Sequence, residues 1–120
     1  MPIRVLVVED SVLITSALRI LLESNGYDVT VAGTALEAVE AGTHSPPHVL
    51  LLDLTLPDAD GLWVIEELSS RDIRPVVKLA MTGYDDAGTH QRCIAAGCDA
   101  VLVKPVPVRD ILRAIADRMT

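Results

Sequence analysis

Residues 49–53 read Val-Leu-Leu-Leu-Asp, four large apolar side chains followed at once by a carboxylate. Such an aliphatic run is typical of a strand buried on both faces of a parallel sheet. Asp53 would then stand at the carboxyl end of that strand, which is the edge where open α/β sheets bind ligands. We therefore expect the chemistry of this chain to gather around Asp53.

Three more apolar runs also end at polar residues. They are Val5–Val8 before Glu9 and Asp10, Leu79–Met81 before Thr82, and Val101–Val103 before Lys104 and Pro105. If these runs are neighbouring parallel strands, their carboxyl ends meet at one edge of one sheet. Three carboxylates, a hydroxyl and an ammonium would then share one crevice. This combination predicts a site for a divalent metal ion and a phosphoryl group.

Strands and helices are expected to alternate from end to end. The apolar spacing and the Gly, Pro and capping residues predict strands at 3–8, 28–32, 49–52, 77–81 and 100–103, and helices at 12–24, 34–42, 61–70, 87–96 and 107–118. Alternation of this kind requires right-handed crossovers between parallel strands, with helices on both faces of the sheet. The fold class is therefore α/β, a flavodoxin-like doubly wound (βα)5 sheet of five strands in the order 2-1-3-4-5. Its ligand crevice lies between the first and third strands.

Composition limits the classes of function. A chain of 120 residues is expected to form one domain over residues 1–120, and 50% hydrophobic residues argue against disorder. The net charge of −7 argues against nucleic-acid or anionic-membrane binding by this chain alone. Because no apolar stretch approaches the roughly 18 residues needed to cross a bilayer, we expect a cytoplasmic location. Cys93 and Cys98 are expected to be buried, reduced thiols.

The carboxylates are the clearest chemical feature. Like charges held close together repel, and a cation relieves that repulsion. Mg²⁺ prefers oxygen ligands in octahedral geometry and keeps several waters, so Glu9, Asp10 and Asp53 suit it. The alternative is a solvated acidic rim on a strongly acidic protein.

Asp53 is the candidate nucleophile, because a carboxylate can accept a phosphoryl group to form an aspartyl phosphate. Lys104 would pair with Asp53 at rest and with phosphoryl oxygens afterwards, and Thr82 would donate a hydrogen bond to such an oxygen. The alternatives are a surface lysine and a threonine that caps a helix or turn.

The order of these motifs resembles the receiver domain of two-component response regulators. The match covers the whole chain and consists of Glu9-Asp10, residues 53–57 with Gly61, Thr82-Gly83 and Lys104-Pro105. The resemblance implies that Asp53 is phosphorylated by a sensor histidine kinase or a histidine phosphotransfer protein. It also implies that Mg²⁺ or Mn²⁺ is bound by Glu9, Asp10, Asp53 and the carbonyl of Thr55, that Thr82 and Lys104 contact the phosphoryl group, and that the peptide bond before Pro105 is cis.

One position departs from the family pattern. Members often carry Tyr or Phe three residues before the lysine, where an aromatic ring moves with the threonine, and here that position is Val101. The usual output through that ring is therefore not expected. Thr55 and Tyr84 stand where the family tunes attack of water on the phosphoryl group, and we expect Tyr84 to shield it.

The leading interpretation is a signalling switch that hydrolyses its own phosphoryl group but is not a multiple-turnover enzyme. Its output would be contact with a downstream protein or relay of the phosphoryl group, as a monomer or weak dimer. The chain would be a single-domain regulator, or a piece of a larger regulator or hybrid kinase. A small aspartyl-phosphate phosphatase is the alternative, although Thr55 stands where such enzymes carry a second Asp. A flavin-binding carrier would need a phosphate-binding loop where Glu9 and Asp10 stand.

Overall fold

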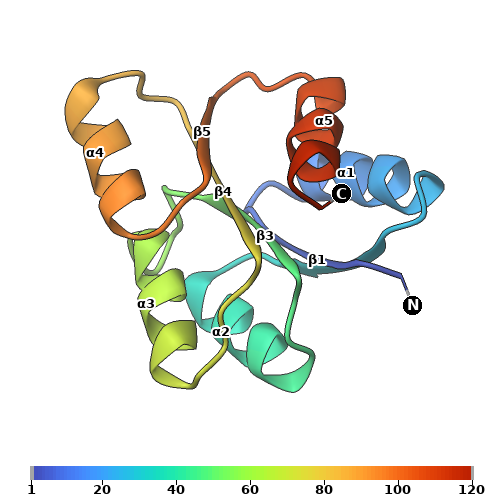
Figure 1. Cartoon of the computed structure of the whole chain (residues 1–120), viewed down its shortest axis with the longest axis horizontal. Helices are drawn as coiled ribbons and strands as arrows, with labels where there is room; N and C mark the ends of the chain where they lie inside the picture. The colour runs from blue at the N-terminus through green and yellow to red at the C-terminus, as the bar shows by residue number, and fades with distance from the viewer. Residues whose placement is uncertain (1, 120) are drawn as a thin grey trace.

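The computed structural model describes residues 2–119, which form one parallel sheet with the strand order β2-β1-β3-β4-β5 (Figure 1). In chain order the elements are β1 (Arg4–Val8), α1 (Val12–Ser24), β2 (Asp28–Ala32), α2 (Ala35–His44), β3 (Val49–Asp53), α3 (Leu62–Ser70), β4 (Val77–Thr82), α4 (Ala87–Ala95), β5 (Ala100–Val103) and α5 (Val108–Met119). The predicted fold class and strand order are confirmed. Residues 1 and 120 of the predicted domain lie outside the described range. Within it, no helix has the length and apolar character needed to cross a membrane.

The sheet separates two layers of helices. In Figure 1, α1 and α5 cover one face, and α2, α3 and α4 lie on the other. Side chains alternate between the two faces, so Leu6, Leu50 and Leu52 join the core under α2 and α3, whereas Val7 and Leu51 join the core under α1 and α5. Full burial of each such side chain stabilises the fold by about 1.5–3 kcal/mol.

Strands β3 and β4 are each one residue longer in the structure than the apolar runs predicted. Asp53 pairs with Met81 in the ladder of β3 and β4, and Thr82 pairs with Val103 in the ladder of β4 and β5. The hydrogen-bonded backbone therefore continues through the first polar residue at each strand end. This continuation fixes the backbone of both Asp53 and Thr82 within the sheet.

The helix ends follow local chemistry. The side chain of Ser11 accepts a hydrogen bond from the Ile14 amide to cap α1, and Thr34 accepts one from the Glu37 amide to cap α2. Gly26 follows α1 with a φ of +90°, a conformation that glycine adopts without strain. Helix α2 runs to His44, beyond the predicted end near Gly42, because its hydrogen bonding continues to Ser45.

Helix α4 is the most weakly anchored. Cys93 is its buried residue, and Ile94 is 61% exposed. Cys93 and Cys98 are free, buried thiols, as predicted, and burial raises the pKa of Cys98 to about 12. Thiolates are therefore scarce there, which fits a structural role for both residues.

Candidate functional site

Three carboxylates meet at the carboxyl edge of the sheet. Val8 pairs with Leu52 in the ladder of β1 and β3. Glu9 and Asp10, which follow β1, therefore lie beside Asp53 at the end of β3. Each of Glu9, Asp10 and Asp53 offers a carboxylate oxygen, and these three oxygens lie within 4.8 Å of one another. The acids that the sequence placed on separate strand ends thus point to the same side of the molecule.

Lys104, the residue after β5, reaches into this cluster. Its Nζ lies 2.8 Å from Oδ2 of Asp53 and 2.9 Å from Oε2 of Glu9. The Lys104 amide donates to the carbonyl of Thr82 over 2.7 Å, which joins the residue to the neighbouring strand end. The peptide bond between Lys104 and Pro105 is cis, the form that the family resemblance implies.

Asp53 is held from two sides. Its side chain is 5% exposed, Oδ2 accepts from Lys104, and Oδ1 accepts from the Thr55 amide over 3.0 Å. The chain then turns back on itself, because the Gly61 amide donates to the Leu54 carbonyl over 2.8 Å. A Cβ atom at Gly61 would lie 2.2 Å from the Asp53 carbonyl oxygen, so only glycine fits this approach.

Burial and hydrogen bonding shift the pKa of both Glu9 and Lys104. Glu9 is 2% exposed, and desolvation raises its pKa although hydrogen bonds from Lys104 and from the Ser11 amide act in the opposite direction. Burial also disfavours the ammonium of Lys104, but its bonds to Asp53 and Glu9 outweigh that and raise its pKa. The lysine therefore stays charged and balances part of the negative charge.

The hydroxyl of Thr82 lies at the end of β4 and is buried. Its Oγ1 accepts a hydrogen bond from the Tyr84 amide over 3.0 Å, which leaves the hydroxyl hydrogen available for another acceptor. Tyr84 itself is 66% exposed. Val101 is half-buried and packs against the core between the sheet and α2, α3 and α4.

The donor set fits a small divalent cation. Carboxylate oxygens are the ligands that Mg²⁺ takes in proteins, and Asp10 is exposed, which leaves room for the waters that this ion retains. Lys104 neutralises only part of a group of three carboxylates, so an added cation would relieve the remaining repulsion. The site could thus hold Mg²⁺ among the carboxylates of Glu9, Asp10 and Asp53, beside the backbone of Thr55.

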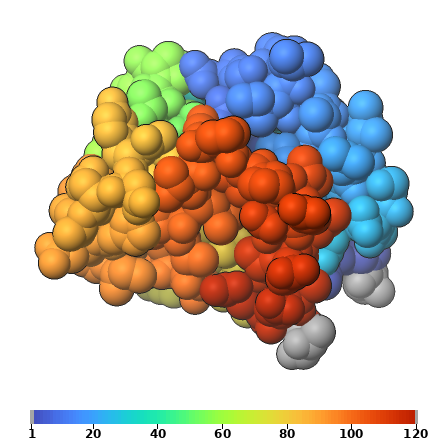
Figure 2. All heavy atoms as spheres, turned by 90° about the horizontal axis from the view of Figure 1, so that it is seen from above, coloured from blue at the N-terminus to red at the C-terminus, as the bar shows by residue number. Residues whose placement is uncertain are grey.

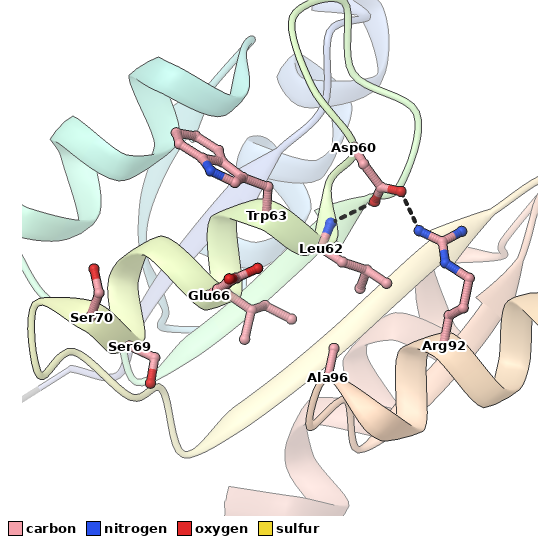
Figure 3. Close-up of a pocket in the computed structure, with 9 residues that line it drawn as sticks. Asp60, Leu62, Trp63, Glu66, Ser69, Ser70, Arg92 and Ala96 are labelled. Carbon is pink, nitrogen blue, oxygen red and sulfur yellow. Dashed lines mark hydrogen bonds and ion pairs between the residues drawn. The ribbon is translucent and has the colours of Figure 1, made fainter.

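The loop between β3 and α3 carries two further carboxylates that the sequence did not single out. Asp58 accepts hydrogen bonds from two backbone amides of α2, and Asp60 forms an ion pair with Arg92 on α4. Asp60 and Arg92 point toward each other at the edge of a groove of about 760 Å³ between α3 and α4 (Figure 3). In the sequence, the acidic, turn-forming composition of residues 57–61 was the one feature that pointed to these contacts.

The loops at this end of the sheet form one continuous surface. In Figure 2 the green segment that follows β3 lies next to the blue segment at the start of α1, and the orange segment that follows β5 occupies the centre of the same face. The carboxylate cluster and Lys104 belong to these segments. A partner that reaches Asp53 therefore meets residues from α1 and from the segment after β5.

Comparison with known proteins identifies the family of this chain. The family model for the response regulator receiver domain matches residues 5–116. The chain is 36% identical over 115 residues to the transcriptional regulatory protein PdtaR of Mycobacterium tuberculosis, covering 95% of this chain but only 55% of that relative. It is 32% identical over 116 residues to the polar-differentiation response regulator DivK of Brucella anthropi, covering 96% of this chain and 94% of that relative.

Solved structures agree with this result. A CheY-like receiver domain protein from Methanospirillum hungatei is 30% identical, with a TM-score of 0.90 over 99% of this chain and 94% of that one. The receiver domain of the sensor histidine kinase PA1611 from Pseudomonas aeruginosa shares the fold at 24% identity, with a TM-score of 0.83 over 99% of this chain and 98% of that one. In that structure a magnesium ion is coordinated in the active-site cleft. The present chain belongs to the response regulator receiver domains of two-component systems.

Proposed function

We propose that this domain is a phosphoacceptor switch in which Asp53 receives a phosphoryl group from a phosphohistidine. The donor would be a sensor histidine kinase or a histidine phosphotransfer protein. The observation that carries the proposal is the meeting of three carboxylates and one ammonium at the ends of β1, β3 and β5. Structural carboxylates without such a role are rarely gathered and buried together, because each costs desolvation energy.

The transfer uses one carboxylate oxygen of Asp53 as the nucleophile. That oxygen forms a bond to phosphorus, the phosphorus–nitrogen bond to the donor histidine breaks, and the electron pair returns to the imidazole, which takes up a proton. Mg²⁺ held by Glu9, Asp10, Asp53 and the Thr55 carbonyl would neutralise charge on the phosphoryl oxygens. The hydrogen bond from the Thr55 amide orients the acceptor carboxylate for this reaction.

Lys104 and Thr82 are placed to contact the phosphoryl group once it is on Asp53. The ammonium that pairs with Asp53 at rest is placed to follow the new negative charge onto a phosphoryl oxygen. Thr82 pairs with Val103 of β5, and its hydroxyl has a hydrogen to donate to a second oxygen. These new contacts shift the population of the loops that carry them. Because Val101 offers no aromatic ring, that shift is read out by the loops and α4 rather than by a ring at this position.

The domain acts as a switch and not as a multiple-turnover enzyme, since the phosphoryl group is lost by hydrolysis only after it has altered protein contacts. Its output is contact with a downstream protein or transfer to a phosphotransfer protein. We further propose a cytoplasmic domain that is monomeric or weakly dimeric. Multiple-turnover hydrolysis of a small phosphate ester would contradict this role and favour a phosphatase.

Intact-mass measurement after incubation with acetyl phosphate and Mg²⁺ tests the proposal. We expect the wild-type protein to gain one phosphoryl group and Asp53→Asn to gain none. Asp117→Asn is the matched control, because Asp117 is exposed on α5 away from the site, and it should react as the wild type does. Equal phosphorylation of the wild type and Asp53→Asn would refute the assignment.

A further inference from the structure

The tip of the loop between β3 and α3 is fastened to a different helix. Oδ1 of Asp58 accepts from the Ala35 amide over 2.8 Å, and Oδ2 accepts from the Leu36 amide over 3.0 Å. These amides belong to the first turn of α2, where backbone N–H groups have no partner inside the helix. One carboxylate thus satisfies two donors that lie more than twenty residues away in the chain.

This contact is charge-assisted. The two amides hold the pKa of Asp58 below its usual range, and the positive end of the α2 dipole faces the same carboxylate. Thr34 satisfies the next amide of the turn, that of Glu37, over 3.1 Å. Helix α2 therefore has two independent caps, and only that of Asp58 joins it to the loop.

The loop also carries the backbone of the metal site. Thr55 lies three residues before Asp58, with Pro57 between them to restrict the chain. At its base the loop is closed by the bridge between Thr55 and Asp60. The loop is also held at its start, where the buried side chains of Leu54 and Leu56 pack against the core. Among residues 2–119, its side chains are bonded to other elements through Asp58 on the α2 side and through Asp60 on the α4 side.

We propose that Asp58 is a positioning residue for the metal site: by clamping the loop to the start of α2, it holds the Thr55 carbonyl where Mg²⁺ binds. The inference rests on the proposed function, which makes that carbonyl a ligand. Asp58 itself touches neither the metal nor the phosphoryl group. Its effect passes through the backbone of Leu56 and Pro57, the two residues that separate it from Thr55.

Calorimetric titration of the whole chain with Mg²⁺, together with thermal melting, tests the clamp. Asp58→Ala removes both hydrogen bonds to α2, and we expect it to raise the Kd for Mg²⁺ about tenfold, the lower end of the effect of losing an outer partner of a metal ligand. Asp58→Asn keeps one oxygen acceptor, so its Kd should fall between those of Asp58→Ala and the wild type.

Thr34→Ala is the matched control. It removes the other cap of the same helix and should lower the melting temperature to a similar extent, yet leave the Kd for Mg²⁺ within twofold of wild type. An unchanged Kd in Asp58→Ala, or an equal rise in Thr34→Ala, would overturn the inference while Mg²⁺ binding by the wild type still supported the proposed function. A wild type that binds Mg²⁺ no better than Asp53→Asn would overturn both.

Discussion

Gly61 gives the sharpest test of how the loop is built onto the site. A Cβ atom on this residue would lie 2.2 Å from the Asp53 carbonyl oxygen and 2.9 Å from the Cα of Leu54. Side-chain Cβ atoms do not approach other atoms within 3.0 Å, so Gly61→Ala must move the two backbones apart by at least 0.8 Å, the difference between 2.2 Å and 3.0 Å. Both partners are backbone atoms, so no side chain can turn aside to relieve the overlap.

We expect Gly61→Ala to lower the free energy of unfolding by about 2–3 kcal/mol, the upper part of the range for overpacking. For a domain of this size that corresponds to a fall in melting temperature of about 8–12 °C. Because a displacement near 1 Å at a reacting group can cost about 100-fold in rate, phosphorylation of Asp53 by acetyl phosphate should slow at least tenfold.

Thermal melting monitored by circular dichroism measures the first effect, and timed intact-mass analysis measures the second. Gly83→Ala is the control for stability, because a Cβ atom there has nothing within 4 Å and should change the unfolding free energy by less than about 0.5 kcal/mol. A Gly61→Ala protein that melts and reacts as the wild type does would refute the steric argument.

Three further changes follow from the same contacts. Without Mg²⁺ at pH 7, Glu9→Gln should raise the melting temperature, because folding then no longer buries an ionised carboxylate. The gain should shrink as the pH falls through the raised pKa of Glu9 toward its usual 4.5, since the wild-type carboxyl is then neutral as well. A gain that stays constant with pH would count against burial as the cause. Tyr84→Ala should hasten loss of phosphate from the phosphorylated protein, and an unchanged half-life would show that Tyr84 shields nothing. Arg92→Gln breaks a half-exposed ion pair with Asp60, so urea unfolding should reveal a loss below about 1 kcal/mol that fades in high salt.

The fold and the centre of the site were predictable because their signals are local. Aliphatic runs identify buried strands, and the polar residue that ends each run must lie at the carboxyl edge once the strands are parallel. The register of β1 and β3 then brings Glu9 and Asp53 together, as expected. The strand ends themselves were missed by one residue, since ladder pairing continues through Asp53 and Thr82 regardless of side-chain polarity.

The contacts that hold the β3–α3 loop to α2 and α4 were not predictable from the spacing of apolar residues. Asp58 bonds to α2 and Asp60 pairs with Arg92 on α4, contacts between segments 22 or more residues apart. Their partners depend on how far the loop leans toward each helix, and no spacing of apolar residues encodes that direction. An acidic loop beside a helix N-terminus suggests such a cap only after the topology is known.

The ends of β1 and β3 are proposed to hold a divalent cation jointly beside Asp53. Crystals grown with Mn²⁺, which stands in for Mg²⁺ and scatters anomalously, would test it directly. We expect one strong anomalous peak among the carboxylate oxygens of Glu9, Asp10 and Asp53 and the Thr55 carbonyl oxygen. A map in which Mn²⁺ binds elsewhere, or in which Lys104 alone occupies the space between the carboxylates at saturating Mn²⁺, would contradict it.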